Sequence, residues 1–362
     1  MSSPLIIAVT GLHAGENPQP GVGVIRSLRR RLGRDDIRIV GLVYDVLESS
    51  VYTDDGPDAV FEFPYPSAGN DAMLARLDYI LESYPIDVLI PTLDAEIMPL
   101  IQLSNALSER GVKMMLPDAA AFKARSKQEL ESLTENCGCR TPKSISVYDP
   151  KSAAETASAL GYPVMIKGQY YEAYKAVNES ALVAHFHAIM NKWGAPVLVQ
   201  EYIDGSEFNV VAVGDGEGGT GGYCTVRKTI VSEKGKGYGA IVIRDEALNA
   251  IAIRIMEHLK WRGPIEVEFV QETRTGEYCL IEVNPRFPAW VDFPSTFGHN
   301  LPALLIETLQ TGTMPKLPDY PTGKFFLRHC VDITCDVADM GKLSALGEWI
   351  RNESTNEEVT HV

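Results

Sequence analysis

The sequence lacks a run of about 18 consecutive apolar residues, so no part of it predicts a membrane-spanning helix. Its first residues, MSSPLIIAVTG, contain no basic stretch ahead of an apolar core, which is the pattern of a secretion signal. They predict a first buried strand instead. We therefore expect a cytoplasmic protein with no membrane partner.

Positive charge is also scarce. The chain has 33 lysines and arginines against 48 aspartates and glutamates, which gives a formal net charge of −15 at pH 7. Nucleic acids and anionic membranes are polyanions, so this balance excludes them as the main binding partners. It does not exclude a nucleotide substrate, because a few local lysines decide whether a phosphate chain is bound.

Paired metal-binding cysteines are absent. None of the six cysteines belongs to a paired CxxC set, and Cys137 with Cys139 alone does not make a structural zinc site. His185 and His187 fall in an expected helix, where side chains at i and i+2 point apart. We expect reduced thiols and no zinc centre.

A strong pattern is present between residues 263 and 302, which read GPIEVEFVQETRTGEYCLIEVNPRFPAWVDFPSTFGHNLP. It predicts two strands joined by a short turn. Polar side chains recur at every second position: Glu266 and Glu268 in the first strand, Glu282 and Asn284 in the second, with Arg286 following. Alternate residues share one face of a strand, so three carboxylates and an amide meet if the polar faces coincide. Hard oxygen ligands beside an arginine suit Mg²⁺ carrying a nucleotide phosphate chain.

This pattern resembles the ATP-grasp superfamily, in particular its carbamoyl-phosphate synthetase and biotin carboxylase-like branch. The matching residues are Glu268 in one strand and Glu282-x-Asn284-x-Arg286 in the next, and the resemblance covers roughly residues 5 to 312. It implies that Glu268, Glu282 and Asn284 bind metal, that two Mg²⁺ ions are present with Mn²⁺ as a substitute, and that Arg286 is catalytic near the γ-phosphate.

The strand and helix patterns predict an α/β protein with an α+β lid. Strands and helices alternate through residues 1–117, which favours a doubly wound parallel sheet. By resemblance this is a Rossmann-like pre-ATP-grasp domain, followed by a two-lobed ATP-grasp fold. We expect the small lobe, or lid, at 118–195, the large lobe with the Mg²⁺ site at 196–312, and a C-terminal strand with a polar tail at 313–362.

A dehydrogenase is a rival interpretation of the first domain. Glycines between Gly15 and Gly23 follow the first strand, and Asp45 ends the second, where a dinucleotide-binding fold places its ribose-binding acid. The spacing is not G-x-G-x-x-G, however, and this interpretation leaves the pattern at 263–302 unexplained.

The resemblance also implies a nucleotide site. Lys127 and Lys167 would contact the ATP phosphates from the lid, and the backbone around Glu201 and Ile203 would pair with the adenine edge. Glu207 would accept hydrogen bonds from the ribose hydroxyls, a role that suits a carboxylate because it offers several acceptor positions.

The segment after Lys167 departs from the family, because residues 168–176 contain a single glycine where a glycine-rich loop usually covers the phosphates. This departure supports a sensor with weak or lost catalysis as an alternative. Basic residues at Lys175, Arg227, Lys228, Lys234 and Lys236 are further candidates for phosphate or substrate contact. Of these, Lys228 is our predicted catalytic residue.

The resemblance implies phosphorylation of a carboxylate by ATP, followed by attack of an amine on the acyl phosphate to give an amide. An amino acid or peptide is the expected substrate, with Trp290, Arg328 and His329 as candidates near it. The alternatives are a bicarbonate-phosphorylating enzyme of the carbamoyl or carboxylase type and a non-catalytic ATP-binding sensor. A homodimer is compatible with the sequence.

Overall fold

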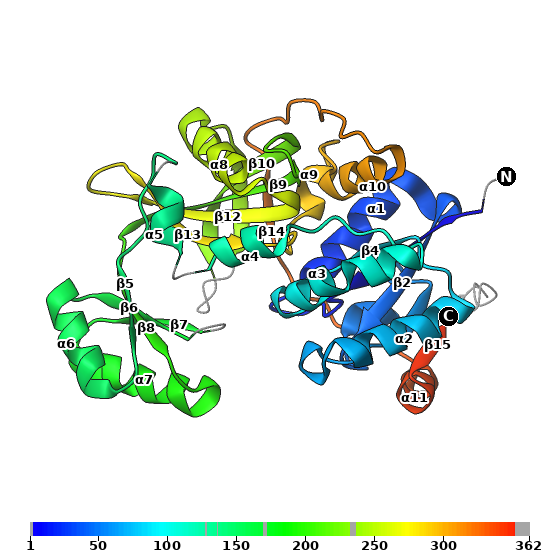
Figure 1. Cartoon of the computed structure of the whole chain (residues 1–362), viewed down its shortest axis with the longest axis horizontal. Helices are drawn as coiled ribbons and strands as arrows, with labels where there is room; N and C mark the ends of the chain where they lie inside the picture. The colour runs from blue at the N-terminus through cyan, green and yellow to red at the C-terminus, as the bar shows by residue number, and fades with distance from the viewer. Residues whose placement is uncertain (1–2, 127–128, 136, 169–171, 232–236, 352–362) are drawn as a thin grey trace, which may run out of the picture.

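The computed structural model describes residues 3–126, 129–135, 137–168, 172–231 and 237–351. Three sheets form the N-terminal domain, a central body and a lid (Figure 1). Within the described ranges, no helix is both long and apolar enough to cross a membrane.

The N-terminal domain confirms the predicted doubly wound parallel sheet. Its elements are β1 (Leu5–Thr10), α1 (Pro20–Asp36), β2 (Ile37–Val43), β3 (Ala59–Glu62), α2 (Asn70–Ser83), β4 (Val88–Ile90) and α3 (Asp94–Glu109), with short 3-10 helices at Ser49–Tyr52 and Pro66–Ala68. The strand order is β15-β3-β2-β1-β4, and β1 to β4 run parallel. The strands are nearly continuous apolar runs because helices cover both faces of the sheet. Lys113 adds an isolated parallel bridge to Val88 of β4.

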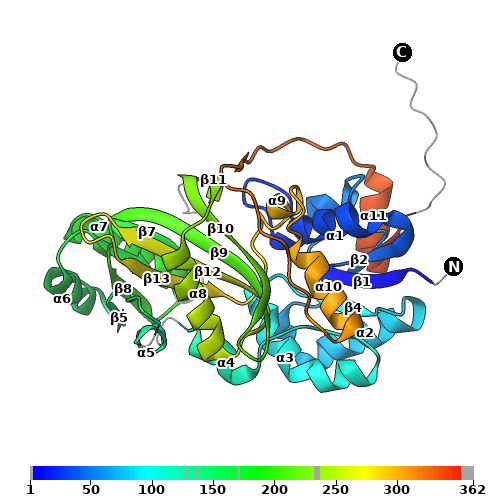
Figure 2. The same cartoon turned by 90° about the horizontal axis from the view of Figure 1, so that it is seen from above.

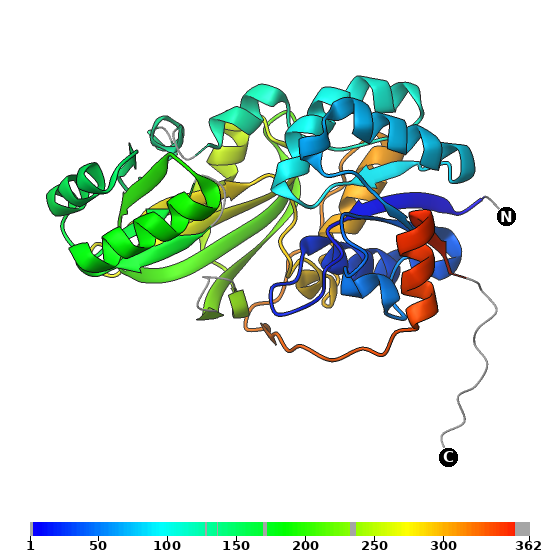
Figure 3. The same ribbon diagram turned by 90° about the horizontal axis from the view of Figure 1, so that it is seen from below.

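The C-terminal segment differs from the expectation of one strand and a polar tail. The strand pattern at 324–333 forms only β14 (Phe325–Leu327), and α11 (Val337–Leu346) and β15 (Glu348–Ile350) follow it. β15 pairs antiparallel with β3, so the chain returns to the N-terminal sheet, as Figure 3 shows. Trp349 packs on Tyr52 at 5.8 Å between ring centroids, a contact that no local pattern predicts.

The central body is an antiparallel sheet in the order β13-β12-β9-β10-β11-β14. Its elements are β9 (Gly205–Asp215), β10 (Thr220–Val231), β11 (Gly237–Ile243), α8 (Glu246–Leu259), β12 (Arg262–Glu272), β13 (Tyr278–Asn284), α9 (Asp292–Ser295) and α10 (Leu301–Thr311). Figure 2 shows the long strands β9, β10 and β12 side by side, with α10 beside the N-terminal domain.

The lid is a four-stranded antiparallel sheet in the order β5-β8-β6-β7. It contains β5 (Ser144–Val147), α6 (Pro150–Leu160), β6 (Val164–Lys167), β7 (Ala173–Ala176), α7 (Glu179–Trp193) and β8 (Val197–Glu201). Two short helices lead into it, α4 (Ala119–Ala124), which the Asp118 side chain caps, and α5 (Leu130–Thr134).

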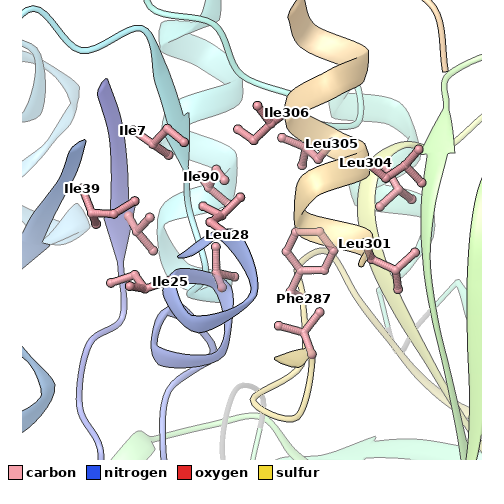
Figure 4. Packing of buried hydrophobic residues seen from close by; sticks show 14 of the residues in the cluster. Ile7, Ile25, Leu28, Ile39, Ile90, Phe287, Leu301, Leu304, Leu305 and Ile306 are labelled. Carbon is pink, nitrogen blue, oxygen red and sulfur yellow. The ribbon is translucent and has the colours of Figure 1, made fainter. Parts of the chain in front are cut away.

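The hydrophobic cores divide the molecule into two bodies. One cluster contains Ile7 of β1, Leu28 of α1, Val211 of β9 and Leu305 of α10, so it joins the N-terminal sheet to the central sheet. Figure 4 shows α1 and α10 packed against each other in this cluster. The lid has a separate cluster drawn only from residues between 147 and 199. The site therefore lies between a large body and a smaller, independently packed lid.

Candidate active site

A cleft of about 670 Å³ lies between the lid sheet, the central sheet and the loop that precedes α1. Eight of the predicted site residues line it: Lys167, Glu201, Ile203, Glu207, Lys228, Glu268, Glu282 and Arg286. Asn284 lies directly beneath, hydrogen-bonded to Glu268. Lys127 falls outside the described residues.

The strand register brings the predicted polar faces together. Glu266 lies opposite Asn284 and Glu268 lies opposite Glu282 in the β12–β13 pair. A bulge then follows, because Phe269 pairs with Leu280 rather than with Ile281. The extra residue lets Leu280 enter the core while Glu282 stays on the cleft face.

The amide of Asn284 is held in one orientation. Its Nδ2 donates to Glu266 Oε2 at 3.1 Å and to Glu268 Oε1 at 3.0 Å. These two bonds use the donor side of the amide, which leaves Oδ1 as the atom able to bind a cation. The orientation therefore fits the predicted role of Asn284 as an oxygen ligand.

Glu266 is an organising residue that was not among the predicted site residues. It is 4% exposed and accepts hydrogen bonds from Asn209 Nδ2 at 2.7 Å, Trp290 Nε1 at 3.1 Å and Arg286 at 3.4 Å, besides that from Asn284. Burial raises the pKa of the Glu266 carboxyl and the charge of Glu268 adds to this, whereas Arg286 opposes it. Strand alternation placed Glu266 and Asn284 on this face, but no local pattern marked Asn209 or Trp290 as partners of Glu266.

Arg286 connects the central sheet to the N-terminal domain. Its Nε donates to Asp94 Oδ2 at 2.9 Å, and Asp94 is the first residue of α3. Burial alone would lower the pKa of the guanidinium, but the carboxylates of Asp94 and Glu266 outweigh burial and raise it. Arg125 lies 3.7 Å from Asp94 and donates to the carbonyl oxygen of Val283 at 3.3 Å. The sequence analysis identified neither Asp94 nor Arg125.

Lys228 is the member of the basic pair that faces the cleft, since Arg227 is exposed and does not line it. Its ammonium lies 2.9 Å from Glu207 Oε2 and 3.0 Å from Glu268 Oε2. Burial would lower the pKa of Lys228, but Glu268 and Glu207 raise it well above the ordinary value. Lys228 therefore joins the predicted ribose-binding residue to a predicted metal ligand. Lys234 and Lys236 lie outside the described residues.

The donor set fits a hard cation that also binds phosphate. Among the described residues, no three aspartate, glutamate, histidine or cysteine side chains form a metal cage by themselves. Mg²⁺ does not need one, because it binds through one or two carboxylates together with phosphates and water. The buried Oδ1 of Asn209 has no hydrogen-bond partner in the described structure, and Asn209 lines the cleft. A buried oxygen of this kind suits a bound ion or its water.

The lid contributes Lys167 at the end of β6 and the strand β8 that leads to Ile203. The Glu201 carboxylate faces the lid base, where it binds Arg140 at 3.0 Å and accepts the backbone N–H of Lys143 at 3.2 Å. Lys175 does not line the cleft, and its ammonium lies 3.8 Å from the ring centroid of Tyr202. The predicted adenine contact therefore depends on the backbone from Glu201 to Ile203 and not on the Glu201 carboxylate.

The far end of the cleft is lined by Trp290 and Arg328. An Arg328 guanidinium nitrogen donates to the carbonyl oxygen of Gly237 at 3.0 Å, and burial lowers its pKa. His329 is exposed and does not line the cleft, and Phe287 is fully buried in the core. Of the predicted substrate candidates Trp290, Arg328 and His329, the first two line the cleft.

The glycines after β1 serve close packing. A Cβ on Gly21 would lie 2.0 Å from the carbonyl oxygen of Thr10, and one on Gly23 would lie 3.2 Å from Val291 Cγ1. Glycine at Gly21 therefore lets α1 start directly against the end of β1. This packing accounts for the glycines without a dinucleotide, which weakens the dehydrogenase interpretation.

Sequence comparisons match part of the chain. The family model described as "ATP-grasp in the biosynthetic pathway with Ter operon" matches residues 194–325, the range that contains Glu201, Glu207, Lys228 and the β12–β13 cluster. The carbamoyl phosphate synthase large chain of Sulfurisphaera tokodaii is 25% identical over 224 residues, which is 58% of this chain and 21% of that protein. The chain thus spans about a fifth of the length of this relative.

Solved structures share the fold over most of the chain. An L-amino acid ligase from Bacillus licheniformis has a TM-score of 0.64 at 14% identity, covering 86% of this chain and 75% of the other. The biotin carboxylase domain of 2-oxoglutarate carboxylase from Hydrogenobacter thermophilus, solved with MgADP, ADP and bicarbonate, has a TM-score of 0.66 at 16% identity. It covers 90% of this chain and 74% of that structure. At this identity the likeness is one of fold.

Proposed function

Because this chain belongs to the ATP-grasp superfamily, we propose that it is an ATP- and Mg²⁺-dependent carboxylate–amine ligase acting through an acyl phosphate. The observation that carries the proposal is the cluster of Glu268, Glu282, Asn284 and Arg286 on one wall of a cleft whose other wall presents Lys167. That arrangement suits a phosphate chain held between a metal site and a basic lid.

Residues of the lid, the hinge and the central sheet would bind the nucleotide. The backbone from Glu201 to Ile203 pairs with the adenine edge, and Glu207 accepts hydrogen bonds from the ribose. Lys167 and Lys127 contact the phosphates from the lid. Lys228, which lies within 3.0 Å of Glu207 and Glu268, adds positive charge where the phosphate chain passes between them.

Glu268, Glu282 and the Oδ1 of Asn284 are the assigned metal ligands. A Mg²⁺ ion held by these residues would supply positive charge to offset that of the phosphate chain. Asn284 is positioned for this role by Glu266, because the bond from Nδ2 to that carboxylate fixes which side of the amide faces the ion. The number of ions, expected to be two, belongs to the same proposal.

The reaction has two steps. A carboxylate oxygen of the substrate attacks the γ-phosphorus, the bond from the γ-phosphorus to the bridging oxygen breaks, and ADP leaves. The nitrogen of the amine then attacks the acyl carbon, phosphate leaves with the bonding electron pair, and the nitrogen releases one proton to the phosphate or to water. Arg286 offers its guanidinium to the equatorial oxygens of the transferring group, held in place by Asp94 and Glu266.

The test is a screen for ADP release. Amino acids and short peptides are supplied in pairs with ATP and Mg²⁺, and the products are identified by mass spectrometry. We expect ADP release that requires both a carboxylate and an amine, with a product lighter than the two substrates together by one water. ADP release that needs only one of the two substrates would overturn the ligase assignment.

Bicarbonate phosphorylation is the second candidate, favoured by the likeness to a carbamoyl phosphate synthase chain and to a biotin carboxylase domain. Bicarbonate as the only added acceptor should then stimulate ADP release. A non-catalytic sensor is the third candidate: it would bind ATP with no ADP release under any substrate pair.

A further inference from the structure

A second cavity, of about 450 Å³, lies at the carboxyl edge of the N-terminal sheet. Residues that follow each parallel strand line it: His13 after β1, Asp45 after β2, Tyr65 after β3 and Leu93 after β4. In the strand order β3-β2-β1-β4, the chain reverses direction across the sheet next to β1. Crevices at such reversal points are where open α/β sheets bind ligands.

The floor of this crevice is rigid. Glu96 is fully buried and accepts hydrogen bonds from the hydroxyls of Thr10 and Tyr44 and from the backbone N–H of Thr92 and Leu93. It thereby ties the ends of β1, β2 and β4 to one carboxylate. Glu48 adds two bonds, from Leu12 N at 2.6 Å and Tyr44 N at 2.8 Å. The cavity is therefore preformed rather than a gap between loose loops.

Its walls expose apolar surface. The ring of Tyr65 stacks on that of Tyr44 with centroids 5.3 Å apart and is still 57% exposed, and Leu47 is 64% exposed. Large apolar side chains left open beside a cavity are typical of ligand contacts. The aliphatic or aromatic part of a ligand can lie against them.

The charge of the crevice selects a cation. The described residues that line it include the carboxylates of Asp45, Glu48 and Glu96 and neither lysine nor arginine. Glu48 and Glu96 are occupied in the floor, whereas Asp45 is exposed and forms no ion pair within the described ranges. One of its oxygens accepts the N–H of Leu47 at 2.8 Å. A ligand ammonium would find a carboxylate and aromatic rings together.

The crevice adjoins the cleft of the proposed active site. Gln19 and Leu93 line both cavities. Gln19 precedes the first residue of α1, and its side chain accepts the backbone N–H of His13 at 2.9 Å, so it forms part of the partition between them. The two cavities are therefore adjacent, with Gln19 and Leu93 as their shared boundary.

We propose that this crevice binds the distal ammonium end of a substrate whose reacting carboxylate or amine lies in the cleft. The substrate class is a basic amino acid, with an aliphatic chain against Tyr65 and Leu47 and a side-chain ammonium at Asp45. This inference rests on the proposed function for the reacting end, but its binding test does not depend on turnover. An anionic dinucleotide phosphate is not a suitable occupant, because neither lysine nor arginine lines the crevice among the described residues.

The test compares two ligands that differ chiefly in a terminal ammonium. Binding of L-lysine and L-norleucine is measured by calorimetry in the presence of Mg²⁺ and a non-hydrolysable ATP analogue. We expect L-lysine to bind about three- to tenfold more tightly, because Asp45 is solvent-exposed and its ion pair is partly screened. Asp45→Asn should remove this preference. Tyr65→Ala should weaken both ligands alike.

Asp71→Asn, an exposed aspartate at the start of α2, is the matched control and should keep the preference. Equal affinity for the two ligands in the unaltered protein, or a preference unchanged by Asp45→Asn, would overturn the inference. If lysine binding depends on Asp45 but no substrate pair gives ADP release, the inference about the crevice is supported and the ligase assignment is contradicted. If neutral substrates give ADP release and lysine is not preferred over norleucine, the ligase assignment is supported and the inference about the crevice is contradicted.

Discussion

The cleft has two walls, one formed by the central sheet and one by the lid, and the two are built differently. On the central wall, Glu266 and Asn284 are buried and Arg286 is 15% exposed. Glu266 accepts hydrogen bonds from both of the others, and Asp94 anchors the group to the N-terminal domain. On the lid wall, Lys167 ends a four-residue strand in a sheet with its own small core. The central wall is therefore held by many hydrogen bonds, whereas the lid wall belongs to a part of the molecule with its own core.

The two walls are joined at the base of the lid. Arg140 contacts Glu201 at 3.0 Å and Glu272 at 3.4 Å, and its backbone bonds to that of Tyr278 and Leu280. Because the lid core shares no residue with the core of the large body, the lid can rotate there without breaking either core. Under the proposed function, the fixed wall would orient the reacting groups, and the lid would bring in the phosphate contacts.

The largest expected effect is on the fixed wall, at Glu282. Glu282→Gln removes a charge opposite Glu268, so Mg²⁺-dependent ATP turnover should fall by about 10³-fold or more while the fold is kept. Turnover is measured as ADP release and the fold by circular dichroism. Glu277→Gln, in the exposed turn of the same hairpin, is the matched control. Normal turnover in Glu282→Gln would contradict the assignment of Glu282 as a metal ligand.

The next effect separates catalysis from binding at Arg286. Lysine cannot bridge Asp94 and Glu266 with two nitrogens and still face a planar phosphoryl group, so Arg286→Lys should lower kcat by about 10²–10³-fold. The Kd for MgATP, measured by calorimetry, should change by less than about threefold. If affinity falls in proportion to rate, Arg286 binds ground-state ATP instead. Unchanged rate and affinity would make Arg286 structural.

The third prediction tests whether the fixed wall depends on its buried network. Glu266→Ala leaves four donors, one of them the Arg286 guanidinium, without their common acceptor. The free energy of unfolding should fall by about 3–5 kcal/mol, measured by urea denaturation. Glu277→Ala, at an exposed position, should stay within about 0.5 kcal/mol of the unaltered protein. A similarly small loss at Glu266 would mean that the network does not stabilise the wall.

On the lid wall the expected effect is on affinity rather than stability. Lys167→Ala removes one charge-assisted phosphate contact, so ATP should bind about tenfold more weakly or worse with an unchanged free energy of unfolding. Lys127→Ala is expected to do the same. Lys151→Ala, whose side chain is 87% exposed on α6, serves as the control. Unchanged ATP affinity in both lid variants would contradict the clamp.

The smallest effect concerns lid motion. Hydrogen exchange with Mg²⁺ and a non-hydrolysable ATP analogue should slow by a few-fold across residues 165–178, because closure buries this edge of the lid. Exchange in β12 should change less, since its wall is already packed. Equal protection of 165–178 with and without nucleotide would argue that the lid does not close.

Local periodicity made the hairpin predictable. Glu268, Glu282 and Asn284 lie on the cleft face because strand side chains alternate, and the pairing of Glu268 with Glu282 completes the arrangement. The alternation of strands and helices in residues 1–117 likewise predicted the parallel sheet. The bulge at Ile281 was not predictable in this way, because it depends on Leu280 finding space in the core.

The sequence by itself determined the two polar strand faces, the α/β order of the first domain and the ATP-grasp signature, since each rests on residues close together in the chain. Only the tertiary structure decided that Arg286 binds Asp94, 192 positions away, and that Lys228 rather than Arg227 lies between Glu207 and Glu268. It also decided that β15 completes the N-terminal sheet. The physical reason is that periodicity fixes which face a side chain occupies, whereas its partner on that face is set by how distant elements pack.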